Sequence, residues 1–174
     1  PAILLDRGLV AALGAIAGRC PVPTVVESTL PEGERLSDAT ERAAYFVVAE
    51  ALANVAKHAS AGRCEIRCRR AEQRLVVEVW DDGAGGAQII PGGGLAGLAG
   101  RVEALDGSLS VESPPGGPTL VRAEMPAAAP AAAPASPAAW AGSQWAGPPA
   151  TDVPVAASAP ATADPAAGTG QEPR

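Results

Sequence analysis

The chain has 174 residues, enough for one domain with a sizeable hydrophobic core. Its 13 basic residues against 19 acidic residues give a formal net charge of −6, which argues against nucleic acid as the main partner. Its single histidine, His58, excludes a metal site built from several histidines.

The cysteines and the absence of long apolar runs bear on the compartment. Cys64 and Cys68 share one predicted strand face about 13 Å apart at ~3.3 Å per residue, and a disulfide needs Cα atoms within about 7 Å. An odd cysteine count without framework spacing fits a reducing compartment. No apolar stretch of about 18 residues could span a membrane, and no secretory signal pattern opens the chain. We therefore expect a cytoplasmic protein. The chain starts with Pro1 rather than Met, so we expect it to be a fragment, and its parent could be membrane-anchored.

The first part of the chain predicts two helices and a strand. Apolar residues at helical spacing predict a helix over residues 5–17, weakened by two glycines. Residues 24–29 are typical of a short strand. Ser37 can cap a long helix that extends to about residue 59. One apolar stripe of that helix is expected to face the core, and it consists of Ala44, Val47, Val48, Leu52 and Val55.

Two strands and a glycine-rich loop are predicted next. Residues 63–70 alternate, with cysteines and an isoleucine on one face and arginines largely on the other. Residues 75–81 are richer in β-branched side chains and predict a central strand. Residues 82–95 are a long glycine-rich loop that precedes the next element.

The last predicted elements are a helix and a hairpin. A short helix is expected over residues 96–106, with Gly107 placed where glycine commonly ends a helix. Residues 109–113 and 120–125 alternate around a turn rich in proline and glycine, which predicts a hairpin. The fold class is therefore α/β: a two-layer sandwich of a mixed sheet with helices on one face.

The composition changes sharply near Pro126. From residue 127 to residue 174 the chain is mostly Ala, Pro, Gly, Ser and Thr, and its repeated prolines forbid a long helix or a central strand. We expect a folded domain over residues 1–126 and a disordered tail over residues 127–174. Trp140 and Trp145 in this tail are either exposed or form a docking motif.

Three polar side chains recur at every fourth position of the long predicted helix. Glu50, Asn54 and His58 therefore line one of its faces, apart from the apolar stripe. A solvated face is one interpretation. The other is a site, because an amide oxygen such as that of Asn54 is a suitable ligand for Mg²⁺ and Glu50 can act as a general base. Lys57 and His58 can meet phosphate oxygens near the helix end.

Glycines follow the central strand in two groups. Asp81 stands before Gly83 and Gly85 in an Asp-x-Gly-x-Gly pattern, which suits either an ordinary turn or the gripping of a flat polar ligand. The segment Gly92-Gly-Gly-Leu-Ala-Gly97 precedes a helix, whose first N–H groups attract anions. No lysine follows it as in a P-loop, and it does not sit between a first strand and its helix as in a dinucleotide fingerprint.

In order, these segments resemble the ATP-binding catalytic domain of bacterial two-component sensor histidine kinases of the GHKL superfamily, in the branch that pairs with helix-turn-helix response regulators. Tyr45-Phe-Val-Val-Ala-Glu-Ala-Leu-Ala-Asn-Val-Ala-Lys-His-Ala59 is similar to its N box. Val79-Trp-Asp-Asp-Gly-Ala-Gly-Gly86 is similar to its G1 box. Gly92-Gly-Gly-Leu-Ala-Gly-Leu-Ala-Gly-Arg-Val-Glu-Ala-Leu-Asp-Gly107 is similar to its G2 box. The likeness covers residues 1–126.

The resemblance implies a Bergerat ATP-binding fold with a mobile lid, and it implies residue roles. Glu50 would help to activate the attacking histidine, and Asn54 would hold Mg²⁺. Asp81 would hydrogen-bond the adenine amino group. The remaining implied ATP-binding residues are Lys57, His58, Gly83, Gly85, Gly92, Gly94, Leu95 and Gly97.

The resemblance also implies partners. The phosphoacceptor histidine of such kinases lies in a separate helical dimerisation domain, upstream of Pro1, so His58 is not that residue. A response regulator would receive the phosphoryl group from that histidine, the parent would be a homodimer, and any membrane contact would come through missing parent segments. The segment Leu98-Ala99-Gly100 departs from the charged residues that many relatives carry after the lid. Two alternatives stay open: another ATP-dependent enzyme, such as an anti-sigma-factor serine kinase or a GHKL ATPase, and a non-catalytic nucleotide-binding module.

Overall fold

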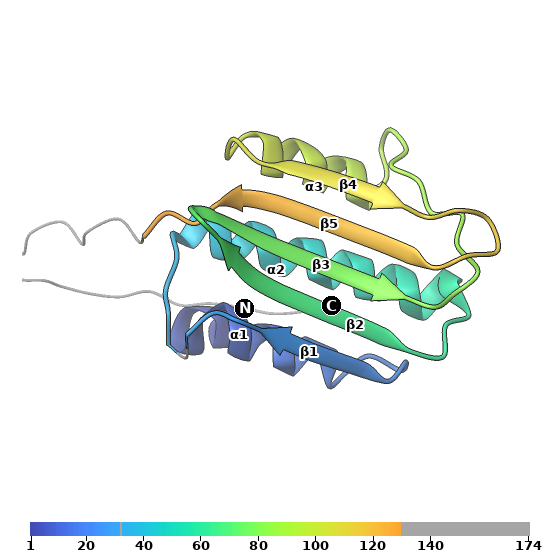
Figure 1. Cartoon of the computed structure of the whole chain (residues 1–174), viewed down its shortest axis with the longest axis horizontal. Helices are drawn as coiled ribbons and strands as arrows, with labels where there is room; N and C mark the ends of the chain where they lie inside the picture. Colours follow the sequence, from blue (N-terminus) through green and yellow to red (C-terminus); the bar gives the residue numbers. More distant parts are fainter. Residues whose placement is uncertain (32, 130–174) are drawn as a thin grey trace, which may run out of the picture. The chain divides into compact units, whose positions relative to one another are not determined.

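The computed structural model describes residues 1–31 and 33–129, which form a five-stranded mixed sheet with helices on one face (Figure 1). The strand order is β1-β2-β3-β5-β4. The strands are Thr24–Ser28 (β1), Cys64–Ala71 (β2), Arg74–Asp81 (β3), Ser108–Glu112 (β4) and Thr119–Pro126 (β5). β1 pairs with β2 in parallel and the other neighbours are antiparallel. The predicted α/β two-layer sandwich, its hairpin and the central place of β3 are confirmed.

The helices are Ala2–Ala17 (α1), Asp38–Asn54 (α2) and Gly94–Glu103 (α3), and α2 continues into a π-helical turn, Val55–Ala59 (η1). The first helix begins before the predicted residue 5, but its backbone leaves the helical region at Gly8, where φ is 79° and ψ is −178°. Only glycine adopts such a conformation readily. Two helical pieces therefore meet at Gly8.

The start of α2 is fixed by polar contacts. The Ser37 side chain caps the helix by accepting a hydrogen bond from Thr40 N–H at 3.2 Å, as predicted. Glu41, only 1 % exposed, accepts bonds from Arg35 Nε at 3.1 Å and from Leu36 N–H at 2.9 Å. A buried carboxylate is tolerated only with such partners, so these bonds define where α2 begins.

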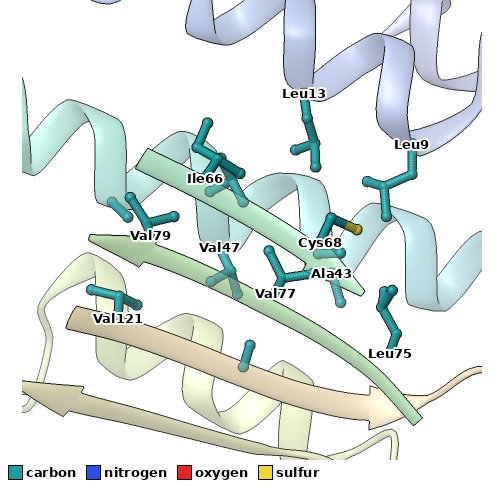
Figure 2. Close-up of a cluster of buried hydrophobic side chains, with 14 of the residues drawn as sticks. Leu9, Leu13, Ala43, Val47, Ile66, Cys68, Leu75, Val77, Val79 and Val121 are labelled. Carbon is teal, nitrogen blue, oxygen red and sulfur yellow. The ribbon is translucent and has the colours of Figure 1, made fainter. Parts of the chain in front are cut away.

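The core lies between the sheet and the helices (Figure 2). The predicted apolar stripe of α2 is buried throughout, with Val47 and Val48 fully inaccessible. It packs on the inward side chains of the central strands, among them Ile66 and Val77. Cys64 and Cys68 belong to this same inward face and are free thiols, as the spacing predicted. Burial of apolar area on this scale is the main stabilising term of the domain.

The bounds predicted for the last helix, 96–106, were wrong at both ends. The helix begins at Gly94, inside the predicted loop, and ends at Glu103. Asp106, rather than Gly107, takes the left-handed conformation after it, with φ of 55°. Gly107 is needed for close packing instead, because a Cβ there would lie 2.4 Å from the carbonyl oxygen of Glu124. This glycine marks a strand contact, not the helix end.

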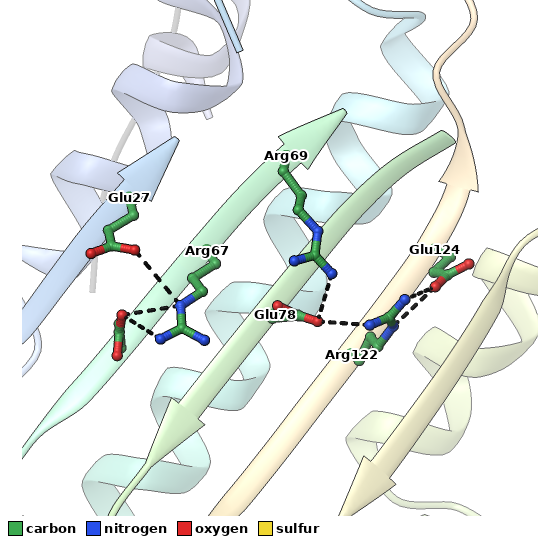
Figure 3. A network of polar contacts seen from close by, with 7 residues as sticks. Glu27, Arg67, Arg69, Glu78, Arg122 and Glu124 are labelled. Atoms are coloured by element: carbon green, nitrogen blue, oxygen red, sulfur yellow. Dashed lines mark hydrogen bonds and ion pairs between the residues drawn. The ribbon is translucent and has the colours of Figure 1, made fainter. Parts of the chain in front are cut away.

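The other face of the sheet carries paired charges (Figure 3). Glu78 on β3 accepts hydrogen bonds from Arg69 Nη2 at 3.2 Å and from Arg122 Nη1 at 2.9 Å. Arg122 also pairs with Glu124 on its own strand. Glu78 is 7 % exposed although no helix formed by residues 1–31 and 33–129 covers this face. The long side chains of Arg69 and Arg122 therefore shield Glu78 and the sheet around it from solvent.

Main-chain contacts continue past the predicted boundary at residue 126. Ala127 N–H donates to the Gln73 carbonyl at 2.8 Å, and Ser37 N–H donates to the Ala128 carbonyl at 2.8 Å. The predicted tail lies outside the described residues from residue 130 onward, with Trp140 and Trp145. The boundary and the disorder of the tail stay predictions.

Candidate functional site

A cavity of about 400 Å³ lies between α2, the ends of β3 and β5, and the loop that leads into α3. This volume is in the range that holds a small-molecule ligand. Seven residues singled out from the sequence line it: Glu50, Asn54, His58, Asp81, Gly85, Gly94 and Leu95. Segments far apart in the sequence therefore converge on one hollow.

The polar face of α2 supplies three of these residues. Glu50 and Asn54 lie within the regular helix, whereas His58 lies in the wider π-helical turn η1. Ser60 then ends the helical segment with a left-handed backbone, at φ of 49°. Lys57 is exposed and does not line the cavity. The choice of a site over a merely solvated face is thus supported for Glu50, Asn54 and His58.

Asp81 at the end of β3 is 3 % exposed and reaches the cavity. Its Oδ1 accepts a hydrogen bond from Gly83 N–H at 2.9 Å. Burial raises the pKa of this carboxyl, and the Gly83 bond partly opposes that rise. A carboxylate held in this way can accept a further hydrogen bond from a ligand amine.

The neighbouring acid, Asp82, has a different role. Its Oδ1 accepts bonds from Gly62 N–H at 2.8 Å and Arg63 N–H at 2.9 Å. These backbone bonds lower the pKa of Asp82. Asp82 therefore fixes the turn before β2, and Asp81 is the acid that faces the cavity.

The glycines of the loop differ in their roles. Gly85 requires glycine, because its φ is 63° and a Cβ would lie 2.0 Å from the Pro114 carbonyl oxygen. Gly83 contributes its N–H to Asp81 rather than a cavity wall. Gly92 is also outside the lining, and Gly97 lines a second groove. The nucleotide contacts expected of Gly83, Gly92 and Gly97 therefore stay predictions.

The second groove, of about 310 Å³, lies between α2 and α3. Glu50 and Gly94 line both hollows, so they form the wall between them. The rest of the groove includes Phe46, which is 42 % exposed, and Arg101. The carboxylate of Glu50 thus lies between two spaces that open on either side of the first turn of α3.

Sequence reasoning missed several residues of the cavity wall, of which Thr119 is the most informative. Thr119 begins β5 and is the register partner of Asp81 on β3. It is 8 % exposed, and its hydroxyl lies 2.8 Å from that of Ser113. No local motif marks it, because its place beside Asp81 depends on the pairing of two distant strands. The other missed lining residues include Ala51, Val55, Val79, Gln88, Ile90 and Val121.

Two features are absent from the described part of the chain. Among residues 1–31 and 33–129, no three His, Cys, Asp or Glu side chains form a group that could hold a metal ion. Within the same described part of the chain, no helix has the length and apolarity needed to cross a membrane.

Comparison with known families gives one match. Residues 39–129, more than half of the chain, match the family of histidine kinase-, DNA gyrase B- and HSP90-like ATPases. The matched segment contains every candidate site residue predicted from the sequence. A search of curated protein sequences found no match.

Solved structures provide a likeness in fold. The chain is similar to the Acinetobacter baumannii histidine kinase AdeS, with 15% identity and a TM-score of 0.52, over 72% of this chain and 64% of that one. It is similar to the catalytic domain of histidine kinase ThkA, with 14% identity and a TM-score of 0.52, over 70% of this chain and 90% of that one.

A third likeness is to the histidine kinase domain of the Erythrobacter litoralis EL346 blue-light activated histidine kinase. The identity is 24% and the TM-score 0.48, over 68% of this chain and 57% of that one. The chain thus spans less than two thirds of the length of the Erythrobacter litoralis domain and of AdeS. At such identities the similarity concerns the fold.

Proposed function

The chain belongs to the family of histidine kinase-, DNA gyrase B- and HSP90-like ATPases, and from this membership we propose that it is the ATP-binding catalytic module of a sensor histidine kinase. It would transfer the γ-phosphoryl group of ATP to a histidine on a separate dimerisation domain, for relay to a response-regulator aspartate. One observation carries the proposal: Glu50 and Asn54 of α2 line a single cavity together with Asp81 of β3, although the two elements are far apart in the sequence.

The adenine base would lie against the sheet end of the cavity. Asp81 would accept a hydrogen bond from the exocyclic amine through the oxygen that does not bind Gly83. Apolar side chains of β3 and β5, Val79 and Val121, line the same part of the wall and suit the flat face of a base. The loop at Gly85 brings main chain close enough to border it.

The phosphates would lie toward the start of α3. Gly94 and Leu95 occupy its first turn and line the cavity, and the N–H groups of a helix start attract anions. His58 of η1 lines the same cavity. Lys57 would add a positive charge by extending from the exposed end of η1. Gly92 and Gly97 flank this turn and would belong to the lid.

The donor set also fits Mg²⁺. The ion prefers oxygen ligands and usually shares them between a protein group and substrate phosphates. Asn54 offers an amide oxygen in the cavity, with Glu50 one helical turn away. When bound, Mg²⁺ would neutralise phosphate charge. The absence of a group of three acidic, histidine or cysteine side chains in the described residues is compatible with such shared ligation.

Glu50 is assigned the role of general base or orienting group toward the attacking histidine. Its carboxylate borders both the cavity and the second groove, so an acceptor that enters from the groove would meet it beside the phosphates. Positioning and charge neutralisation supply most of the rate in phosphoryl transfer. In the cell we expect a homodimeric parent that acts in the cytoplasm with a response regulator.

The test combines the full chain with the histidine-bearing helical domain and labelled ATP. An acid-labile phosphohistidine is expected, and Asn54→Ala is expected to abolish it. Equal labelling by this variant would contradict the assignment. Acid-stable phosphoserine on a partner, or phosphate release without a phosphoprotein, would favour the serine kinase or ATPase alternative. Tight ATP binding with no transfer to any histidine domain would favour a non-catalytic module.

A further inference from the structure

The hydroxyl of Ser113 connects two walls of the cavity without lining it. Its Oγ accepts a hydrogen bond from Ala87 N–H at 2.9 Å and lies 2.8 Å from Thr119 Oγ1. The Ser113 carbonyl also accepts from Gly86 N–H at 3.0 Å. Ala87, Gly86 and Thr119 all line the cavity. One serine therefore contacts both the loop after β3 and the first residue of β5.

The distance between the two hydroxyls allows either to donate, and we infer the direction by counting protons and acceptors. A serine hydroxyl has one proton and two acceptor lone pairs. Because Ala87 N–H can only donate, Ser113 Oγ accepts there, and Thr119 Oγ1 is the partner available among the described residues for its proton. Thr119 then accepts from Ser113 and keeps its own proton to donate. The reverse direction would leave the Ser113 proton without a described partner, which is unfavourable at a partly buried position.

The donor state of Thr119 matters because of its neighbour. Asp81 and Thr119 are register partners on adjacent strands, and both line the cavity. An acceptor beside a donor matches the edge of adenine, whose amine donates and whose adjacent ring nitrogen accepts, directly or through one water. Guanine presents the reverse pattern, a carbonyl acceptor beside an N–H donor. Since Thr119 is 8 % exposed and Asp81 is 3 % exposed, a mismatched base would leave poorly solvated polar groups unpaired.

We propose that Ser113 is a positioning residue that fixes the Thr119 hydroxyl as a donor and thereby makes the cavity select adenine over guanine. The inference rests on the proposed function, since it assumes that the cavity holds a nucleotide base. It adds a residue of the β4–β5 turn, outside every motif recognised in the sequence, to the determinants of specificity.

The experiment measures dissociation constants of ATP and GTP for the full chain, its Ser113→Ala variant and its Ser113→Thr variant. Ser113→Ala is expected to weaken ATP binding about five- to tenfold, as for one lost hydrogen bond, with no loss for GTP. The preference for ATP falls by the same factor. Ser113→Thr keeps a hydroxyl and is expected to keep the preference. If Ser113→Ala does not fold, Ser113→Cys, with only a weak donor, is expected to lower it as well.

A second pair of variants tests whether Ser113 acts through Thr119. Thr119→Val keeps the side-chain shape and removes the hydroxyl, so it should lower the preference for ATP as Ser113→Ala does. In the double variant the preference should fall no further, because the two changes remove one and the same interaction. A merely structural role for Ser113 would instead lower the unfolding midpoint and the affinities for both nucleotides alike.

The outcomes distinguish a failure of the proposed ATP-binding function from a failure of the inference about base specificity. A wild-type chain that binds no adenine nucleotide would overturn both. A wild-type chain that binds ATP and GTP equally would overturn the specificity inference alone. So would an unchanged preference in Ser113→Ala, equal losses for both nucleotides, a Ser113→Thr variant as impaired as Ser113→Ala, or additive losses in the double variant.

Discussion

The carboxylate of Glu50 fills the space that any side chain at position 94 would need. A Cβ built on Gly94 would lie 2.0 Å from Glu50 Oε1 and 3.0 Å from Glu50 Oε2. This contact joins α2 to the first turn of α3 and separates the cavity from the second groove. Glycine at position 94 therefore leaves the space that the proposed catalytic carboxylate occupies.

Gly94→Ala is expected to displace Glu50 while preserving the fold, because a flexible side chain can move away from a methyl group. Displacement of a catalytic group by about 1 Å can lower a rate by up to about 100-fold. We expect phosphotransfer to the helical domain to fall at least about tenfold. The measurement is the initial rate of phosphohistidine formation at saturating ATP.

Gly100→Ala is the matched control in the same helix. Apart from its chain neighbours and the backbone of its own helix, no atom lies within 4 Å of a Cβ at this position, so alanine should fit without displacement. It should stabilise α3 by up to about 1 kcal/mol, since glycine is a poor helix former, and leave the rate near that of the wild type. Equal rates for Gly94→Ala and Gly100→Ala would contradict the importance of the Glu50 contact.

Asp81→Asn should weaken ATP binding. Gly83 N–H would remain bonded to the amide oxygen, so that the NH₂ group faces the cavity and opposes a ligand amine. Loss of a hydrogen bond to a charged acceptor predicts an ATP affinity about 10- to 100-fold lower. Asp82→Asn is the control, because Asp82 bonds the turn at residues 62–63 and does not line the cavity. An Asp81→Asn variant with wild-type affinity would remove Asp81 from the base site.

The same substitution has a predictable pH dependence. Because burial raises the pKa of Asp81 in the folded state, the folded chain keeps this proton to higher pH than the unfolded chain. The contribution of Asp81 to stability is thus greatest at low pH and is lost as the pH rises through the raised pKa. At neutral pH, Asp81→Asn should therefore unfold at a higher temperature than the wild type. Thermal scans from acidic to neutral pH should show this difference shrink toward the acidic end.

The elements were predictable where local pattern alone decides them. The apolar stripe of α2, the Ser37 cap and the alternation of β2 each follow from neighbouring residues, and each is confirmed. The π-helical turn η1 and the break at Gly8 were not predicted. Periodicity says little about them, because tertiary packing decides how a helix end widens or breaks.

The residues of the candidate site likewise include some that local pattern predicts and some that it does not. Glu50, Asn54 and His58 were accessible from helical spacing, and Asp81 from its place after a strand. Thr119 was not, because it became significant only through its register with Asp81. Its anchor Ser113 lies in a turn whose residues predicted only a hairpin. These two residues could be placed only from contacts between segments that are far apart in the sequence.

Glu41→Ala should destabilise the domain through its buried bonds. The substitution leaves the Leu36 N–H and the Arg35 guanidinium without their acceptor. We expect the free energy of unfolding in urea to fall by about 1–3 kcal/mol. Glu27→Ala is the control, because Glu27 is 62% exposed and lies 3.7 Å from Arg67. It should change stability by less than about 0.5 kcal/mol. Similar losses for both variants would contradict the role of burial.

The three thiols should differ in reactivity. Burial raises the pKa of Cys68 to about 12 and that of Cys64 to about 11, whereas Cys20 is partly exposed. Since the thiolate is the reactive form, an alkylating reagent at pH 8 should modify Cys20 quickly. The other two should react only as fast as the chain unfolds. Mass spectrometry of the time course would count the modified sites, and rapid modification of Cys68 would contradict its burial.

The charged side chains on the open face of the sheet also restrict how the strands can align. A shift of two residues keeps every apolar side chain facing the helices, so the hydrophobic pattern does not oppose it. In the observed alignment Glu78 is opposite Arg67 on one side and Arg122 on the other. A two-residue shift in one direction would set Glu78 against Glu65, and the equivalent shift of β5 would set it against Glu124. Repulsion between like charges therefore disfavours misaligned sheets that the core alone would accept.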